Sequence, residues 1–342
     1  MKEWQKQERF EALLSGELTD RPIISGWRHF LDKEQNADDL AETTIAFTKQ
    51  FEWDWVKINP RATYLAEIWG NTFDFHDYNW VFPKQTLAAI NKPEDVWDLQ
   101  RMKPASSPPL LEQLDAAKKI REGLPDTPLT QTIFSPLTVL LFLAGQAAYA
   151  SSTVYGSDEP VILESLFVNQ RAGVHHALRV ISETLADYVK ELESIGIDGV
   201  FYAVTGTAHP ELFHEDAFNE FSRPYDSIVL DAVSNGKTIL HTCGAYAHPE
   251  RFNDYDIDGI SWDTKATGNP GLDADLKATK IGGVAHELFI KDSSLILEES
   301  EKALKEMEGK PFLLAPNCAI PPSVTDEALY QFQNSVMKKG AF

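Results

Sequence analysis

Three residues in this sequence, one histidine and two cysteines, have the types and spacing of zinc ligands. His241 and Cys243 end one apolar run, and Cys318 follows another near the end of the chain. Residues i and i+2 of a strand point to the same face, so His241 and Cys243 can bind one ion while Thr242 points away. The three supply three of the four ligands of a tetrahedral zinc ion. The alternative interpretation is that both cysteines are small buried residues of the core.

A zinc ion with these ligands would favour chemistry on a thiol. Two thiolates and a histidine leave the ion with little net positive charge, and such an ion can hold a further thiol as thiolate at neutral pH. A free thiol is only a few per cent ionised there, so this activation is useful. The fourth ligand could be Asp263, His286, Glu287 or the thiol of a substrate. Asp263 could instead orient His241 through a hydrogen bond.

The elements that must position these residues follow a regular pattern. Eight short apolar runs have the composition of strands buried on both faces. They cover residues 22–26, 55–59, 129–134, 199–204, 238–242, 259–262, 281–285 and 312–315. Helical periodicity appears between most of them, at 175–195, at 215–234 with a break or bend near Pro224, and at 295–307. This alternation predicts an α/β fold, a (β/α)₈ TIM barrel, with residues 1–342 forming a single domain.

The connection after the second strand, residues 61–128, is unusually long. It is rich in aromatic residues, which are Trp69, Phe73, Phe75, Tyr78, Trp80 and Phe82. We expect it to form helices and an aromatic flap that covers the mouth of the barrel. The alternative is an added structural layer.

Active sites of such barrels lie at the C-terminal ends of the strands. His241 and Cys243 end the fifth predicted strand, Asp263 ends the sixth and Cys318 follows the eighth, so all four should meet at the same mouth.

Further candidate residues for binding a substrate stand at the ends of the second and fourth predicted strands. Lys57 and Asn59 could contact a substrate or an oxyanion, or could make only a structural hydrogen bond under the flap. Tyr202 and His209 could line the pocket or protonate a leaving group, since histidine is the usual acid–base residue near neutral pH.

Composition restricts the class of protein. The chain has 31 basic and 52 acidic residues, a formal net charge of −21, which disfavours nucleic acid and anionic membranes as partners. The polar N-terminus has no apolar signal-peptide core, and the longest apolar stretch, 137–144, is far shorter than the ~20 residues that span a bilayer. Two distant cysteines do not form a disulfide framework. We expect a cytoplasmic protein with reduced thiols.

Several segments give the chain a resemblance to a known superfamily. They are residues 54–63, 134–139, 196–202, 223–225, 259–263 and 314–322. On these segments the chain resembles the uroporphyrinogen decarboxylase superfamily over nearly its whole length. The resemblance implies a single (β/α)₈ barrel. It also implies one of two activities: decarboxylation, or zinc-dependent transfer of a methyl group from a corrinoid protein to a thiol such as coenzyme M.

The site residues favour the methyltransferase branch. The decarboxylases follow the first strand with Arg-Gln-Ala-Gly-Arg, whose arginines bind substrate carboxylates. This chain has a single arginine there, Arg28, a candidate for substrate binding. Asn59 stands near the place of the decarboxylase aspartate, and Phe142 aligns with its active-site tyrosine. Cys318 occupies the place of its late histidine.

His241, Cys243 and Cys318 match the zinc ligands of the methyltransferase branch. The resemblance therefore implies a zinc-dependent transfer of methyl from a methyl-corrinoid to a small-molecule thiol. Since the chain has no Asp-x-His-x-x-Gly corrinoid-binding motif, the donor must be a separate protein or a free cofactor. Two alternatives stay open, a cofactor-free uroporphyrinogen decarboxylase and a non-enzymatic tetrapyrrole- or corrinoid-binding protein. A homodimer is possible.

Overall fold

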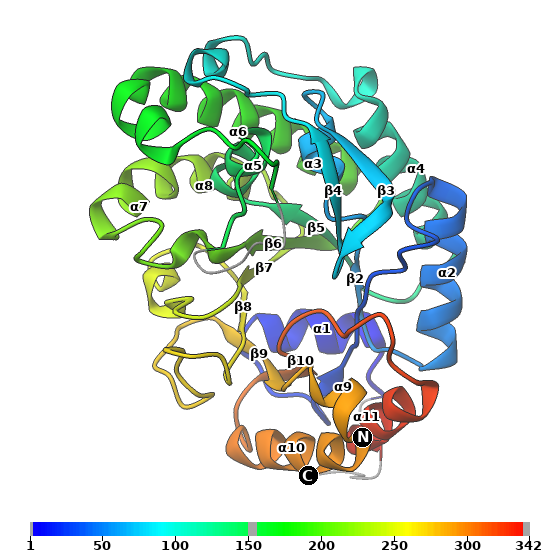
Figure 1. Cartoon of the computed structure of the whole chain (residues 1–342). Coiled ribbons are helices and arrows are strands. Elements are labelled where there is room, and N and C mark those ends of the chain that lie inside the picture. The colour runs from blue at the N-terminus through cyan, green and yellow to red at the C-terminus, as the bar shows by residue number, and fades with distance from the viewer. Residues whose placement is uncertain (1–2, 150–155, 338–342) are drawn as a thin grey trace.

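The computed structural model describes residues 3–149 and 156–337, and its centre is a parallel sheet of eight strands (Figure 1). The strand order is β1-β10-β9-β8-β7-β6-β5-β2, and every pairing within it is parallel. The strands are β1 (Ile23–Ile24), β2 (Val56–Ile58), β5 (Leu129–Phe134), β6 (Gly199–Val204), β7 (Lys237–Thr242), β8 (Gly259–Trp262), β9 (Thr279–Val284) and β10 (Phe312–Pro316).

All eight predicted strands are therefore confirmed, most with ends within two residues of those expected. The two strands at the ends of this order, β1 and β2, meet through single hydrogen bonds instead of a ladder. The backbone N–H of Asp54 donates to the carbonyl of Ile24 at 3.0 Å, and the Ser25 hydroxyl donates to the carbonyl of Trp55 at 2.7 Å. These contacts close the sheet into the barrel that the alternation of strands and helices predicts.

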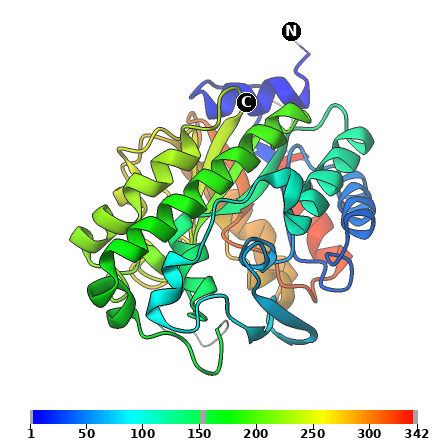
Figure 2. The same cartoon turned by 90° about the horizontal axis from the view of Figure 1, so that it is seen from above.

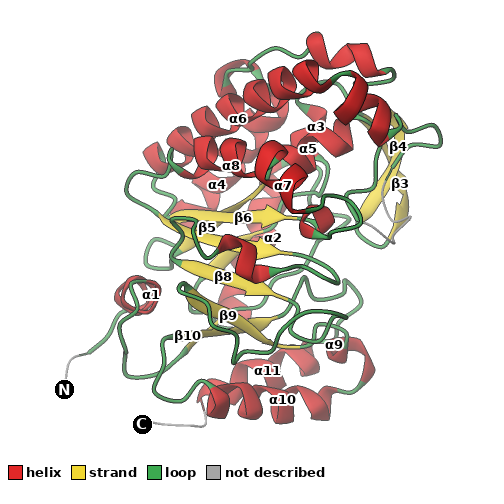
Figure 3. Cartoon of the chain, turned by 90° about the vertical axis from the view of Figure 1, so that its left-hand side faces the viewer, coloured by secondary structure: helices red, strands yellow, loops and turns green. Residues whose placement is uncertain are grey.

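Helices surround the strands (Figures 2 and 3). They are α1 (Lys6–Leu14), α2 (Ala37–Gln50), α3 (Tyr64–Glu67), α4 (Pro108–Gly123), α5 (Pro136–Leu143), α6 (Arg171–Ser194), α7 (Glu215–Phe221), α8 (Arg223–Leu230), α9 (Leu288–Lys291), α10 (Ser293–Glu306) and α11 (Asp326–Met337). The three predicted helical segments correspond to α6, to α7 with α8, and to α10. The break expected near Pro224 falls between α7 and α8, because proline fits only the first turn of a helix.

The barrel has two distinct ends. Helix α1 lies at the end where the strands begin, and the segment that follows α3 lies at the opposite end (Figures 2 and 3). Phe10, Leu13 and Leu14 of α1 are buried in one cluster with residues of the barrel interior, including Trp55 and Phe201. The polar N-terminal sequence did not indicate this helix. It closes the end of the barrel at which the strands begin.

The connection after β2 differs in detail from the expectation. Its aromatic part is an antiparallel hairpin of β3 (Thr72–Asn79) and β4 (Phe82–Leu87), with helix α4 after it. Alternating exposure along β3 shows a strand with one face toward solvent, where the sequence suggested helices and an aromatic flap. Trp80, Val81 and Phe82 at its tip line the cavity at the C-terminal ends of the barrel strands, so the hairpin covers the mouth.

Among the described residues, none of the helices is both long and apolar enough to cross a membrane.

Candidate metal centre

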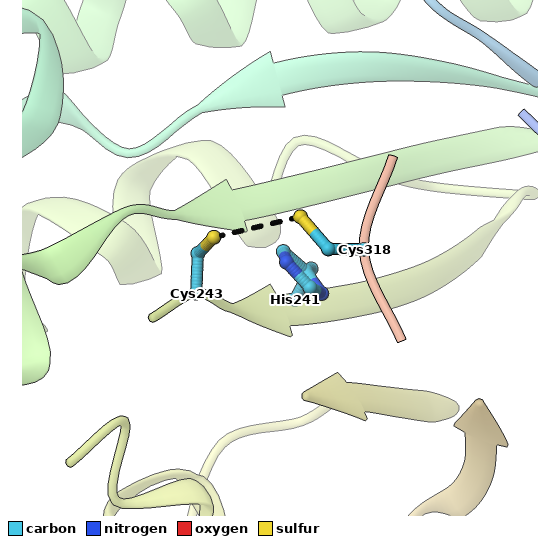
Figure 4. A group of neighbouring side chains, drawn as sticks. All are labelled: His241, Cys243 and Cys318. Atoms are coloured by element: carbon cyan, nitrogen blue, oxygen red, sulfur yellow. Dashed lines mark hydrogen bonds between the residues drawn. The ribbon is translucent and has the colours of Figure 1, made fainter. Parts of the chain in front are cut away.

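The three predicted zinc ligands converge at the mouth of the barrel. His241 lies in β7 and Cys243 directly follows this strand, while Cys318 lies two residues beyond β10. Thr242 points away from them, and its hydroxyl donates to the carbonyl of Ala247 at 2.6 Å. Figure 4 shows both sulfur atoms turned toward each other with the imidazole of His241 beside them. In the alternation predicted from the sequence, His241 and Cys243 therefore face into the barrel and Thr242 faces away from them.

The geometry of the three side chains fits one zinc ion. One ligand atom from each of them lies within 4.8 Å of the others. The sulfur atoms of Cys243 and Cys318 are 3.7 Å apart, far more than the roughly 2.05 Å of a disulfide bond. Two sulfurs on one tetrahedral zinc, with Zn–S bonds of about 2.3 Å, are separated by about 3.8 Å. The sulfur separation is thus the one that a shared zinc ion requires.

A hydrogen bond orients the histidine. Its Nδ1 lies 3.1 Å from the hydroxyl of Ser261, which belongs to the neighbouring strand β8. Ligating imidazoles commonly use one ring nitrogen for the metal and the other for such a partner. Nε2 of His241 is therefore the nitrogen available to a metal. Ser261 has the orienting role that the sequence suggested for Asp263.

The two cysteines and a tyrosine form a hydrogen-bonded chain. The hydrogen bond between the sulfurs lowers the pKa of Cys243 and raises that of Cys318 well above its usual value, with burial adding to the rise at Cys318. The hydroxyl of Tyr149 donates to the Cys243 sulfur at 3.7 Å, and burial raises the pKa of Tyr149. Cys243 is thus the more acidic sulfur, and Cys318 keeps its proton when no metal displaces it.

A cavity of about 80 Å³ opens beside this group and is lined by all three predicted ligands. Much of its wall is aromatic, from Trp27, Tyr149 and Phe201 together with the tip of the hairpin. At about 10–15 Å³ for each water-sized probe, such a volume admits a small molecule. The ion would have three protein ligands and a fourth position toward this cavity, as in catalytic zinc sites.

Lys57 and Asn59 are the polar residues of the cavity that β2 supplies. The Nζ atom of Lys57 donates to the Asn59 side-chain oxygen and lies 4.8 Å from the ring centre of Phe201. Burial lowers the pKa of Lys57 to about 7, against the attraction of Cys318 and Cys243. The side-chain nitrogen of Asn59 is buried and has no hydrogen-bond partner among the described residues. Both side chains can therefore face a bound ligand, as the sequence suggested.

Other candidates from the sequence lie outside this cavity. The hydroxyl of Tyr202 points outward from the barrel and donates to Asp226 of helix α8 at 2.5 Å. His209 packs its ring 5.0 Å from that of Tyr246, and its Nδ1 accepts from the backbone of Glu211.

Arg28 and Asp263 also take other positions than the sequence suggested. The Arg28 guanidinium lies 5.2 Å from the centre of the Phe30 ring and does not line the cavity. Asp263 belongs to a second group of possible metal ligands with His286 and Glu287. None of these three joins the group of His241 and the cysteines.

Tyr149 is a further residue of the site that no pattern in the sequence indicated. The resemblance aligned Phe142 with the decarboxylase tyrosine, but Phe142 is fully buried in α5 and does not line the cavity. Tyr149 lies in the loop that follows α5, beyond any periodic pattern. Gly206 lets this loop come close, because a Cβ there would lie 2.7 Å from the Ala148 carbonyl. In the sequence, the glycine at position 206 was the signal that could have indicated a segment packed closely against it.

Comparison with known proteins supports the architecture. A methyltransferase from Methanosarcina mazei has the same fold with a TM-score of 0.76 and 21% identity, over 97% of this chain and 98% of that one. A B12-independent methionine synthase from Shewanella sp. W3-18-1, in complex with selenomethionine, matches with a TM-score of 0.57 and 12% identity, over 94% and 98% of the two chains. At these identities the likeness establishes a shared fold.

The comparison with curated proteins gives no match. The family description Uroporphyrinogen decarboxylase (URO-D) matches residues 6–338, nearly the whole chain. The match agrees with the eight-stranded barrel and with the resemblance carried by the sequence motifs. The chain belongs to the uroporphyrinogen decarboxylase (URO-D) family.

Proposed function

We propose that this protein is a zinc-dependent methyltransferase that moves a methyl group from a methyl-corrinoid on a partner protein to a small thiol. The observation that carries the proposal is the 3.7 Å pair of cysteine sulfurs, which lies with His241 in the wall of a cavity. The shared fold with a protein described as a methyltransferase and with one described as a B12-independent methionine synthase supports it.

Each residue of the site has a definite task in this reaction. Zinc, when bound, would supply a position at which the acceptor thiol is held as thiolate. The Nζ atom of Lys57 can accept the proton that the thiol loses, because burial lowers the pKa of Lys57 to about 7. The Asn59 side-chain nitrogen is free to donate to the tail of the acceptor. The aromatic wall gives the acceptor an apolar surface to pack against.

Methyl transfer then exchanges one bond for another. The thiolate sulfur attacks the methyl carbon, so a carbon–sulfur bond forms as the carbon–cobalt bond breaks, and the corrinoid leaves with the electron pair of that bond. A cavity of about 80 Å³ admits a small thiol but not a corrinoid ring. The donor must therefore approach from the mouth, on the side of the β3–β4 hairpin, and a partner protein would present it there.

The same site offers little to a tetrapyrrole decarboxylase. Uroporphyrinogen carries eight carboxylates, and the one arginine that the chain retains after β1, Arg28, lies outside the cavity. Arg61 does line the cavity, but its guanidinium is engaged by Glu67 and Glu112. No cluster of free cations therefore meets such a substrate among the residues that the structure describes.

The first test is elemental analysis of the full chain purified without chelator or added metal. We expect about one zinc per chain in the wild type. Cys318→Ser and His241→Ala should lose most or all of this zinc, because each substitution removes one of three ligands. His76→Gln, an exposed histidine of the hairpin, is the matched control and should keep its zinc. Wild-type protein that binds no zinc even after reconstitution under reducing conditions would sink the proposal.

The second test is catalytic. Zinc-loaded protein is given methylcobalamin and a small thiol, and the thioether product is followed by mass spectrometry. We expect turnover in the wild type and at least a 100-fold lower rate in Cys318→Ser. Zinc-loaded protein that makes no thioether, yet converts uroporphyrinogen to coproporphyrinogen, would establish the decarboxylase instead.

A further inference from the structure

A second group of metal-ligating side chains lies at the same end of the barrel. Asp263 directly follows β8, while His286 and Glu287 follow β9, which is the neighbour of β8 in the sheet. One ligand atom from each of the three lies within 4.8 Å of the others. The group contains no sulfur and shares no residue with the group of His241, Cys243 and Cys318.

Among the residues that the structure describes, Oδ2 of Asp263 and Nδ1 of His286 make no hydrogen bond. Oδ1 of Asp263 accepts from the Asn317 side chain at 3.0 Å and from the Lys265 backbone at 2.9 Å. These bonds fix the carboxylate so that Oδ2 lies toward His286, 3.9 Å from its Nδ1. That Nδ1 atom is buried and has no hydrogen-bond partner among the described residues. A buried polar atom without a partner is costly and calls for a ligand.

His286 makes no direct hydrogen bond to either carboxylate of the group. His286 Nδ1 is 3.9 Å from Asp263, and His286 Nε2 is 3.6 Å from Glu287. Both exceed the N–H···O range of about 2.7–3.2 Å. One cation would bind only one of the two ring nitrogens, and one ligand atom from each of the three residues lies within 4.8 Å of the others, so the group can close on one ion. A protonated histidine shared by two carboxylates would instead draw them into hydrogen-bond distance.

Charge and exposure also favour a cation here. Lys265, two residues after Asp263, is directed to Glu299 at 3.5 Å, and the ion pairs of Asp263 and Glu287 among the described residues are with His286. The side chains of Asp263 and His286 are 11% and 15% exposed, whereas that of Glu287 is 47% exposed. Two ligands are thus held by the protein, and the third lies where an ion and its water molecules can enter.

We propose that Asp263, His286 and Glu287 form a second metal site, which takes a divalent first-row cation such as Mn²⁺, Fe²⁺ or Zn²⁺. One imidazole and two carboxylates suit these ions, and water would complete the coordination. Asn317 joins this site to the cysteine site, because it holds Asp263 and directly precedes Cys318. A cation here places positive charge beside the mouth of the cavity, and the proposal does not depend on methyl transfer.

The test uses the full chain loaded with one equivalent of zinc. Mn²⁺ is then titrated into this protein. This ion prefers nitrogen and oxygen ligands to thiolates, so it reports the second site. Free Mn²⁺ is followed by electron paramagnetic resonance. We expect one Mn²⁺ per wild-type chain, with at least tenfold weaker binding in Asp263→Asn, His286→Ala and Glu287→Gln. Glu298→Gln, an exposed carboxylate of α10, is the matched control and should bind as the wild type does.

The variants keep the proposal falsifiable if one of them does not fold. Asp263→Asn retains an oxygen for Asn317, and Glu287 is half exposed, so both changes leave the packing intact. Excess zinc gives a second readout: two zinc ions per wild-type chain should fall to one in Glu287→Gln. Wild-type Mn²⁺ binding no tighter than that of Glu287→Gln, with one zinc in both, would overturn the proposal and leave His286 as an ion-paired histidine.

A further variant separates this proposal from the proposed function. Cys318→Ser should lose the zinc of the cysteine site and keep its Mn²⁺. Loss of the methyl-transfer reaction with retained Mn²⁺ binding would contradict only the first proposal. Normal thioether formation without Mn²⁺ binding would contradict only the second.

Discussion

At the scale of single residues, the centre depends on how two sulfurs share their protons. Without a metal, the hydrogen bond from Cys318 stabilises the Cys243 thiolate and keeps the Cys318 proton in place. The Tyr149 hydroxyl adds a second hydrogen bond to Cys243. Because only thiolates ligate zinc, a metal must displace the Cys318 proton. The affinity for zinc is thereby tied to pH.

We predict that zinc binds more tightly as pH rises. The pKa of Cys318 is raised, so the metal-free protein holds this proton across the neutral range, and each zinc bound releases at least one proton. The apparent Kd should fall about tenfold per pH unit between pH 6 and 8, as expected when one proton is released. Competition with a chromophoric chelator at pH 6, 7 and 8 measures the apparent Kd for zinc. The same measurement is made on Ser261→Ala, a variant that keeps both sulfurs. A Kd independent of pH would show that both cysteines are already ionised or do not bind the metal.

At the scale of the elements, the strands of the barrel decide which side chains meet the site and which support it from behind. In β6, Phe201 points inward to the cavity, and Tyr202 points outward to α8. There Asp226 accepts hydrogen bonds from Tyr202, Ser222 and Tyr255. This buried network joins β6 to its helix and holds the wall of the cavity.

We predict an unusual pH dependence of stability from this network. Burial raises the pKa of Asp226 to about 6, against the hydrogen bonds that lower it. The folded state therefore binds this proton more tightly than the unfolded chain, whose Asp pKa is about 3.9. The resulting stabilisation is fully present below about pH 4 and is lost as pH rises through about 6. The stability of the wild type relative to Asp226→Asn should increase by up to about 3 kcal/mol between pH 7 and pH 4.

Urea unfolding of the wild type and of Asp226→Asn at pH 4, 5, 6 and 7 measures this difference in stability. The comparison cancels the contribution of the other carboxylates, which both proteins share. Asp231→Asn, at the exposed end of α8, is the control and should show no such slope. A stability of the wild type relative to Asp226→Asn that stays constant, or grows toward pH 7, would mean that Asp226 is ionised at no cost in the folded protein.

At the scale of the whole molecule, the barrel is one continuous core from its closed end to its mouth. Phe10, Leu13 and Leu14 of α1 fill the bottom, and Trp55 and Phe201 continue the same cluster upward. Phe201 packs with its ring centre 5.6 Å from that of His241, so the core directly supports a metal ligand. The N-terminal helix is thereby part of the scaffold of the site, although it lies at the opposite end.

We predict that Phe10→Ala lowers the free energy of unfolding by about 3–5 kcal/mol, the usual cost of removing a buried aromatic ring. Phe10 is fully buried, and its ring centre lies 5.8 Å from that of Trp55. The zinc content of the folded protein should stay the same, because no ligand moves. Denaturant unfolding with elemental analysis checks both, and Glu11→Ala on the exposed face of α1 is the control. A loss below about 1 kcal/mol would show that α1 is not part of the core.

The sequence by itself determined the eight strands and the pairing of His241 with Cys243. Apolar runs mark strands buried on both faces, and residues two apart share a face whichever way the strand is turned. Placing Cys318 beside them needed only the rule that parallel strands of a barrel end at the same mouth. These inferences depend on local spacing and on topology, both of which are written in the order of residues.

Only the tertiary structure decided which face of each strand looks into the barrel. The run of β6 is apolar on both faces, so its sequence does not show which residues point into the barrel. Tyr202 was therefore expected in the cavity, which Phe201 lines instead. Asp263 was one of several candidates for the fourth zinc ligand or for orienting His241, and the structure shows Asn317 holding it toward His286. Tyr149 reaches Cys243 from a loop without periodicity. Contacts of this kind arise from packing between distant segments, which no local pattern in the sequence records.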